Sequence, residues 1–191
     1  MKDWLIIALS CCYVLIVLSA ARLLRVDSLY ARKLVHILVS LWIIPCFQIA
    51  SPPLRLAGPL CFVALNYAFF RKQGKGSGLV FFPLSLVLLL TAESMGWLSE
   101  ASVIGSVLIM GLGDGTAAVF GHALGHRKKS LAGFCVMLLV SLALFFFLTR
   151  SWLSFAAALM AAAVEYFTPG GYDNITVPLV SALLMEVLCA L

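Results

Sequence analysis

An aspartate flanked by glycines, Asp114 between Gly113 and Gly115, lies inside a long apolar run. A carboxylate in such a run is costly, so acids placed this way are usually functional or paired with a cation. Glycines let another backbone or a phosphate come close. One interpretation is a site acid whose glycines, together with Gly121, bind a cofactor. The other is a series of packing glycines around an aspartate that a lysine neutralises.

Cations and a hydroxyl follow where this apolar run ends, at Lys128, Lys129 and Ser130. Such a cluster could merely set membrane topology or hold anionic headgroups. Phosphoryl transfer, however, needs cations at the phosphates and a carboxylate for magnesium. Beside Asp114 we therefore expect these residues to bind the phosphates of a nucleotide, with Lys129 and Ser130 as the leading pair.

Two more acidic positions stand out among apolar residues. Glu165 carries the only charge of its apolar run, and Asp173-Asn174 follows Pro-Gly-Gly at the start of another. The Asp-Asn pair could be no more than a helix N-cap. Together with Asp114, the two carboxylates also offer the oxygen ligands that Mg²⁺ prefers. We expect Asp114, Asp173 and Glu165 to hold the metal and Asn174 to contact the nucleotide.

Lys33 and His36 are three residues apart, so on a helix they share one face. His36 begins an apolar run, which makes it a stronger candidate than His122 or His126, although histidines at such boundaries are often structural. Lys75 lies in Gly-Lys-Gly-Ser-Gly, a basic loop that gains a phosphate-binding role only from its neighbours.

The elements that position these residues must be membrane helices. The chain has 191 residues, of which 63% are hydrophobic and 11% charged, against roughly 45–50% and about 25% in soluble domains. The runs are long and not alternating, which indicates helices and not strands. We predict an all-α polytopic bundle of seven or eight spans, forming one domain over 1–191 with a peripheral first helix and loop (1–30) and a catalytic bundle (31–191). The candidate spans are Trp4–Leu24, Leu34–Ala50, Leu54–Phe70, Leu79–Thr91, Ala101–Leu124, Ala132–Thr149, Trp152–Phe167 and Ile175–Leu191.

The basic residues predict the orientation of the bundle. Of the 13 Lys and Arg residues, all but Lys2, Arg55 and Arg150 fall in the first, third and fifth connections. The positive-inside rule places those connections, and every candidate site residue, on the cytoplasmic side. Both termini then lie outside. The clusters are too short for nucleic-acid binding, and the six cysteines lack the spacing of a zinc site or a disulfide framework.

Four blocks in this order resemble the membrane-embedded CTP-dependent lipid kinases, a family that includes dolichol kinase, phytol kinase and bacterial relatives. The resemblance covers nearly all of the chain from residue 32 onward. The blocks are Arg-Lys-Leu-Val-His (32–36), Gly-Ser-Gly-Leu-Val-Phe-Phe-Pro (76–83), the Gly-Asp-Gly to Lys-Ser stretch (111–130) and Asp-Asn-Ile-Thr-Val-Pro (173–178).

The resemblance implies an inner-membrane kinase that transfers the γ-phosphoryl group of CTP, with Mg²⁺, to an isoprenoid alcohol such as phytol, geranylgeraniol or a polyprenol. Asp114 and Asp173 would be catalytic or metal-site acids, with Lys33 and His36 facing the same site. One departure is Ala132, where many members carry Glu, although phytol-kinase-like members are similar in carrying Ala. If that Glu is indispensable in the family, either Glu165 substitutes for it or the chain lacks the activity.

Two rival functions fit the same sequence less well. One is a cytidylyltransferase like CDP-diacylglycerol synthase, whose longer acidic signature near the C-terminus is absent. The other is a lipid-binding or transport protein without enzymatic activity, which would need polar residues in both halves of the bilayer. The expected partners are the lipid alcohol, the nucleotide and membrane lipids, with no nucleic acid. The alcohol itself and a homo-oligomeric state are left open.

Overall fold

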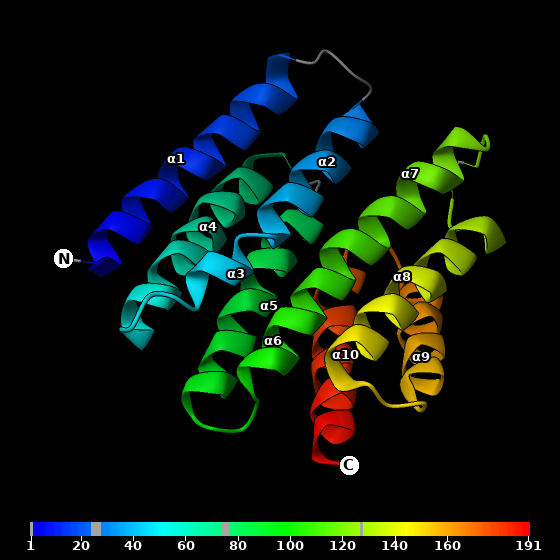
Figure 1. The fold of residues 1–191 in the computed structure, drawn as a ribbon. Helices are drawn as coiled ribbons and strands as arrows, with labels where there is room; N and C mark the ends of the chain where they lie inside the picture. Colours follow the sequence, from blue (N-terminus) through cyan, green and yellow to red (C-terminus); the bar gives the residue numbers. More distant parts are fainter. Residues whose placement is uncertain (1, 24–27, 74–76, 127) are drawn as a thin grey trace.

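Regular structure in the described part of the chain is entirely helical (Figure 1). The computed structural model describes residues 2–23, 28–73, 77–126 and 128–191. Its helices are α1 (Lys2–Leu23), α2 (Ser28–Ser40), α3 (Ile43–Cys46), α4 (Pro52–Gln73), α5 (Ser77–Ser94), α6 (Glu100–Leu108), a π-helical segment (Ile109–Asp114), α7 (Gly115–Ala123), α8 (Leu131–Thr149), α9 (Ser154–Phe167) and α10 (Asp173–Ala190).

Each of the eight predicted spans contains helix in its described residues, which confirms the all-α class, but Leu34–Ala50 is broken between α2 and α3 and is not helical after Cys46. Six helices are long and apolar enough to cross a membrane, among them α1, whose crossing the sequence left open. Two other apolar helices, Gly78–Ser94 in α5 and Ser154–Phe167 (α9), are shorter than each of these six. The 14 residues of α9 rise only about 21 Å at 1.5 Å per residue, against a hydrocarbon core of about 30 Å. Helix length therefore does not establish seven or eight spans.

The most buried of the six candidate spans is the continuous helix formed by α6, the π-helical segment and α7. It packs against α2, α8 and α10. Glycines make this packing close: a Cβ at Gly111 would overlap the hydroxyl of Ser40 on α2, and a Cβ at Gly113 would overlap Met137 on α8. Small residues at such contacts let membrane helices approach one another.

Toward one end of the bundle α2, α8 and α10 begin and α9 ends, while the α5–α6 hairpin and both termini lie toward the opposite end (Figure 1). Ser130 fixes the start of α8, because its side chain accepts a hydrogen bond from the backbone N–H of Gly133 at 3.1 Å. The chemistry-bearing residues of the sequence are therefore concentrated at helix ends.

Candidate active site

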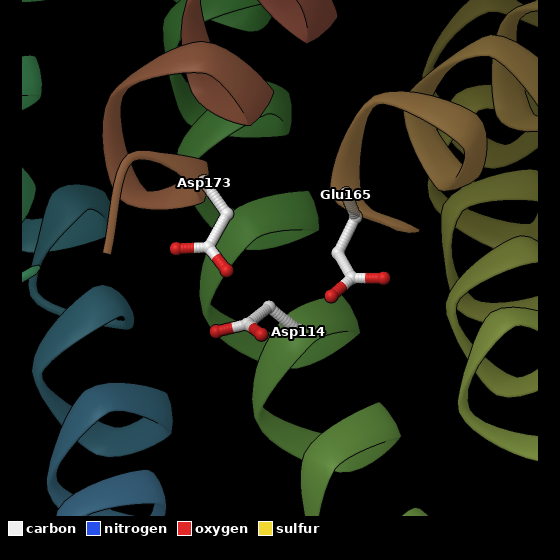
Figure 2. A group of neighbouring side chains, drawn as sticks. All are labelled: Asp114, Glu165 and Asp173. Atoms are coloured by element: carbon white, nitrogen blue, oxygen red, sulfur yellow. The ribbon is translucent and has the colours of Figure 1, made fainter. Parts of the chain in front are cut away.

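Three carboxylates converge between the helices at this end (Figure 2). Asp114 is the last residue of the π-helical segment, Glu165 lies in the last turn of α9, and Asp173 is the first residue of α10. All three residues are buried, with 3%, 5% and 8% of their surface exposed. Each offers a carboxylate oxygen within 4.8 Å of the others. The sequence predicted these three acids as a group, and the structure brings them together.

A tight reversal of the chain places Asp173 opposite Glu165. Pro169 cannot donate the backbone hydrogen bond that would continue α9, and the helix ends at Phe167. Gly171 then adopts a φ of 92°, a conformation that favours glycine. The Pro-Gly-Gly segment that precedes Asp173 in the sequence therefore forms the turn between α9 and α10.

Lys129 binds two of the carboxylates at once. Its Nζ lies 2.8 Å from Glu165 Oε1 and 3.0 Å from Asp173 Oδ2, and it also donates to the backbone carbonyl of Glu165. Burial alone would lower the pKa of Lys129, but hydrogen bonds and charge from Glu165 and Asp173 outweigh it and raise the pKa above its usual value. The Lys129 side chain is therefore positively charged at neutral pH.

Lys33 neutralises the third acid. Its Nζ donates to Asp114 Oδ2 at 2.5 Å, from a side chain that is 25% exposed. Three carboxylates and two ammonium groups leave the cluster with a formal charge of −1. A buried excess of negative charge is unfavourable unless a cation or hydrogen-bond donor joins it.

A cleft of about 250 Å³ opens onto the cluster. Its walls combine polar groups for a charged ligand with apolar ones, including Leu29 and Phe134, for an alkyl chain. Of the residues predicted from sequence, the cleft brings together Lys33, Asp114, Gly121, Lys128, Lys129, Ser130, Glu165 and Asp173.

Four predicted residues lie outside this cleft lining. His36 is packed against Phe82, with ring centroids 4.3 Å apart, and its Nε2 lies 4.0 Å from Asp114 Oδ2, too far for a hydrogen bond. Asn174 donates its side-chain amide to the carbonyl of Gly78 at 2.9 Å, so it ties α10 to α5. The other two are Gly113 and Gly115.

The structure gives Gly113 and Gly115 a different use from the predicted one. A Cβ on Gly115 would overlap Ile37 of α2, and one on Gly113 would overlap Met137 of α8. The close approach that these glycines permit is filled by neighbouring helices and not by a ligand. Lys75, also predicted to bind the cofactor, lies outside the described residues.

Sequence reasoning ranked His36 above His122 and His126, yet the latter two line the cleft and His36 does not. Their four-residue spacing gave no usable signal, because α7 ends at Ala123 and His126 lies beyond Gly125, whose φ is 83°. Phe82 was also missed as the partner of His36. Its place in the Phe-Phe-Pro block gave no hint of which helix it would face.

The donor set fits a small hard cation. Mg²⁺ takes oxygen ligands at about 2.1 Å, so opposite ligands stand about 4.2 Å apart. Adjacent ligands of an octahedral ion stand only about 3.0 Å apart, so oxygens within 4.8 Å of one another would have to close by up to about 2 Å. The three carboxylates provide no sulfur or nitrogen donor, which favours Mg²⁺ or Mn²⁺ over softer metals.

Comparison with known proteins gives one relative. The chain is 32% identical to a phytol kinase of Synechocystis sp. (strain ATCC 27184 / PCC 6803 / Kazusa) over 218 aligned positions. The alignment covers 95% of this chain and 90% of that protein. No family model matches the chain, and no solved structure matches it significantly.

Proposed function

Because the chain belongs to the phytol kinase family, we propose that it is a CTP-dependent kinase that phosphorylates the hydroxyl group of an isoprenoid alcohol. The acceptor is phytol, geranylgeraniol or a longer polyprenol. One observation carries the proposal: three buried carboxylates and two lysines surround a single cleft at the helix ends. Phosphoryl transfer requires this combination of metal-binding acids and phosphate-binding cations.

The acids hold the metal in this proposal. Asp114, Glu165 and Asp173 would hold Mg²⁺, which would supply positive charge to neutralise the triphosphate. Glu165 supplies the third carboxylate of the cluster, whereas the Lys-Ser-Leu-Ala-Gly segment carries Ala132. The hydrogen bond from Lys33 orients Asp114.

The phosphates bind where α8 begins. The N-terminus of a helix attracts anions through its free N–H groups and its dipole, and Ser130 and Gly133 at the start of α8 line the cleft. Lys128 and Lys129 add positive charge there. Gly121 leaves the space beside Ser130 open, since a Cβ at position 121 would lie 3.1 Å from Ser130 Oγ.

The transfer step uses the lipid hydroxyl as nucleophile. Its oxygen bonds to the γ-phosphorus of CTP as the bond from that phosphorus to the β–γ bridging oxygen breaks, and CDP leaves. Asp114 or Asp173 orients the hydroxyl and accepts its proton. The apolar wall around Leu29 and Phe134 receives the first part of the isoprenoid chain.

An assay of purified protein tests this proposal. We expect phosphorylation of phytol or another isoprenoid alcohol with CTP and Mg²⁺, weaker transfer from ATP or GTP, and loss of activity with EDTA that added Mg²⁺ restores. Absence of transfer from every nucleotide to every alcohol, with the protein shown to be folded, would refute the proposal.

We place the cleft on the cytoplasmic side of the inner membrane, where most of the basic residues gather. Eight crossings then put the C-terminus outside. A C-terminal alkaline phosphatase fusion should be active, and a C-terminal green fluorescent protein fusion should be dark. The reverse pattern would contradict either the orientation or the even number of spans.

A further inference from the structure

Lys129 has no free hydrogen with which to hold a phosphate. An ammonium group has three N–H donors and no acceptor. Here Nζ contacts Glu165 Oε1, Asp173 Oδ2 and the carbonyl oxygen of Glu165. Lys129 can therefore bind an anionic ligand only by giving up contacts with these acids.

Its position is also the one a metal ion would take. The Nζ atom lies between Glu165 and Asp173 at 2.8 and 3.0 Å, and both residues belong to the group of converging carboxylates. An ammonium nitrogen and a divalent cation cannot share that volume. Binding of a metal to Glu165 and Asp173 therefore requires Lys129 to leave.

An alternative position lies within reach of the same side chain. Ser130, the next residue, caps α8, and the helix N-terminus faces the cleft. Phosphates bound there would supply new acceptors for the hydrogens that Lys129 releases. Without phosphates, a departing Lys129 would exchange two charge-assisted hydrogen bonds for water.

The charge of the cluster also favours binding of a metal ion together with a negatively charged ligand. The formal charge of the cluster is −1, from the carboxylates of Asp114, Glu165 and Asp173 and the ammonium groups of Lys33 and Lys129. A divalent cation that bound without any other ligand would change this charge to +1, with both ammonium groups still nearby. Like charges held together in a poorly solvated site repel strongly. A negatively charged ligand that draws Lys129 away removes that repulsion.

We propose that Lys129 is an exchangeable counterion: it occupies the metal position of the nucleotide-free protein and moves to the phosphates when nucleotide arrives, so that metal binds tightly only together with nucleotide. This inference rests on the proposed function, since it assumes that the cleft receives a metal and a nucleoside triphosphate. It makes Lys129 a binding residue with two positions, and the binding of the two ligands becomes cooperative.

The test measures Mn²⁺ binding to the full-length protein in detergent by the loss of the free-ion electron paramagnetic resonance signal. Lys129→Met removes the ammonium group and keeps a chain of similar length. In the absence of nucleotide we expect this variant to bind Mn²⁺ at least about tenfold more tightly than the wild type. With the β,γ-methylene analogue of CTP, the wild type should gain Mn²⁺ affinity and the variant should gain less.

Lys128→Met is the matched control, because Lys128 lines the same cleft but forms no ion pair with the acids of the described cluster. It removes the same charge without vacating the metal position. We expect it to change nucleotide-free Mn²⁺ affinity by no more than about fivefold, the limit for an exposed charge. Equal shifts in the two variants would overturn the exchange and leave only a general charge effect.

Two further results separate this inference from the proposed function. If wild-type protein binds Mn²⁺ without nucleotide as tightly as Lys129→Met does, the exchange is wrong and the kinase proposal is unaffected. If no nucleoside triphosphate analogue improves Mn²⁺ binding to the wild type, both fail together. Lys129→Gln, checked by thermal unfolding, replaces the methionine variant if that variant does not fold, and the same outcomes decide.

Discussion

The two ends of this bundle use charge in different ways. At the end opposite the cleft, Arg55 and Glu93 form an ion pair with N–O distances of 3.1 and 3.3 Å. Arg55 also donates to the carbonyl of Ile49 at 2.7 Å, and its guanidinium lies 5.0 Å from the ring centroid of Phe47. Within this pair the opposite charges are equal in number, and a neighbouring carbonyl accepts a further N–H. Such a pair joins the loop after α3 to α4 and α5 and needs no ligand.

At the cleft, three carboxylates face two lysines, and the remaining negative charge borders an open volume. A structural ion pair tends toward neutrality and satisfied donors, whereas a binding site keeps charge that only a ligand completes. The comparison explains why charge inside an apolar chain does not identify a site by itself. Access to a cleft distinguishes the acids at Lys129 and Lys33 from the Arg55–Glu93 pair.

The largest expected difference between the two ends is the loss of enzymatic activity in Asp114→Asn compared with that in Glu93→Gln. Asparagine keeps the shape of Asp114 but removes the charge that pairs with Lys33 and binds metal, so we expect activity to fall by about a thousandfold. Glu93→Gln should change activity by no more than about twofold, since an ion pair of this kind contributes only modestly. Initial rates with saturating CTP and phytol measure both. Comparable losses would contradict the assignment of chemistry to one end.

Glu165→Gln and Asp173→Asn should have smaller effects, about 10–100-fold each, because two ligands remain and Lys129 keeps one partner. The lost activity should be partly restored by higher Mg²⁺ concentrations. Since both acids contact Lys129, the double variant should lose less than the product of the single losses. Strict additivity in a double-mutant cycle would indicate that the two acids act separately.

A packing change comes next in size. Gly111→Ala introduces a Cβ where Ser40 already lies, and we expect about 1–3 kcal/mol of destabilisation, the usual cost of overpacking. Gly58→Ala is the matched control on α4, since its Cβ would make only a 4.0 Å contact with Trp42. Thermal unfolding in detergent measures both. Equal melting temperatures for the two variants would show that the α2 interface is looser than described.

The smallest expected effect is that of Arg55→Met. Its partner Glu93 has a side chain that is 20% exposed, so water can solvate the carboxylate that remains. We expect a loss of about 1 kcal/mol in stability and a normal affinity for Mg²⁺ and CTP. A change in the affinity for either ligand would mean that the two ends of the bundle are coupled.

Much of the site could be predicted from the sequence because burying charge among apolar residues is costly. Asp114, Glu165 and Asp173 each stood out in an apolar context, and the structure brings all three together. The helical class followed from composition for the same reason. The cost of removing charged groups from water therefore makes such residues recognisable in the sequence.

Other features depended on packing that the sequence does not display. The π-helical segment before Gly115 widens one turn by a residue, so projection at 3.6 residues per turn misplaces the faces of α7. His122 on α7 lines the cleft, a placement that the spacing of the apolar residues alone did not predict. The partners of Gly113 and Gly115 depended on which helices came alongside, and spacing alone does not distinguish a helix neighbour from a phosphate.

The most direct test of the central claim follows two labels of CTP in one reaction with phytol and Mg²⁺. If the proposed function is correct, label from the γ-phosphate is transferred to the alcohol and label at the α-phosphate stays in CDP. Transfer of the α-label to a lipid would instead identify a cytidylyltransferase. Retention of both labels in CTP by folded protein, with each isoprenoid alcohol tried, would contradict an enzymatic role for the cleft.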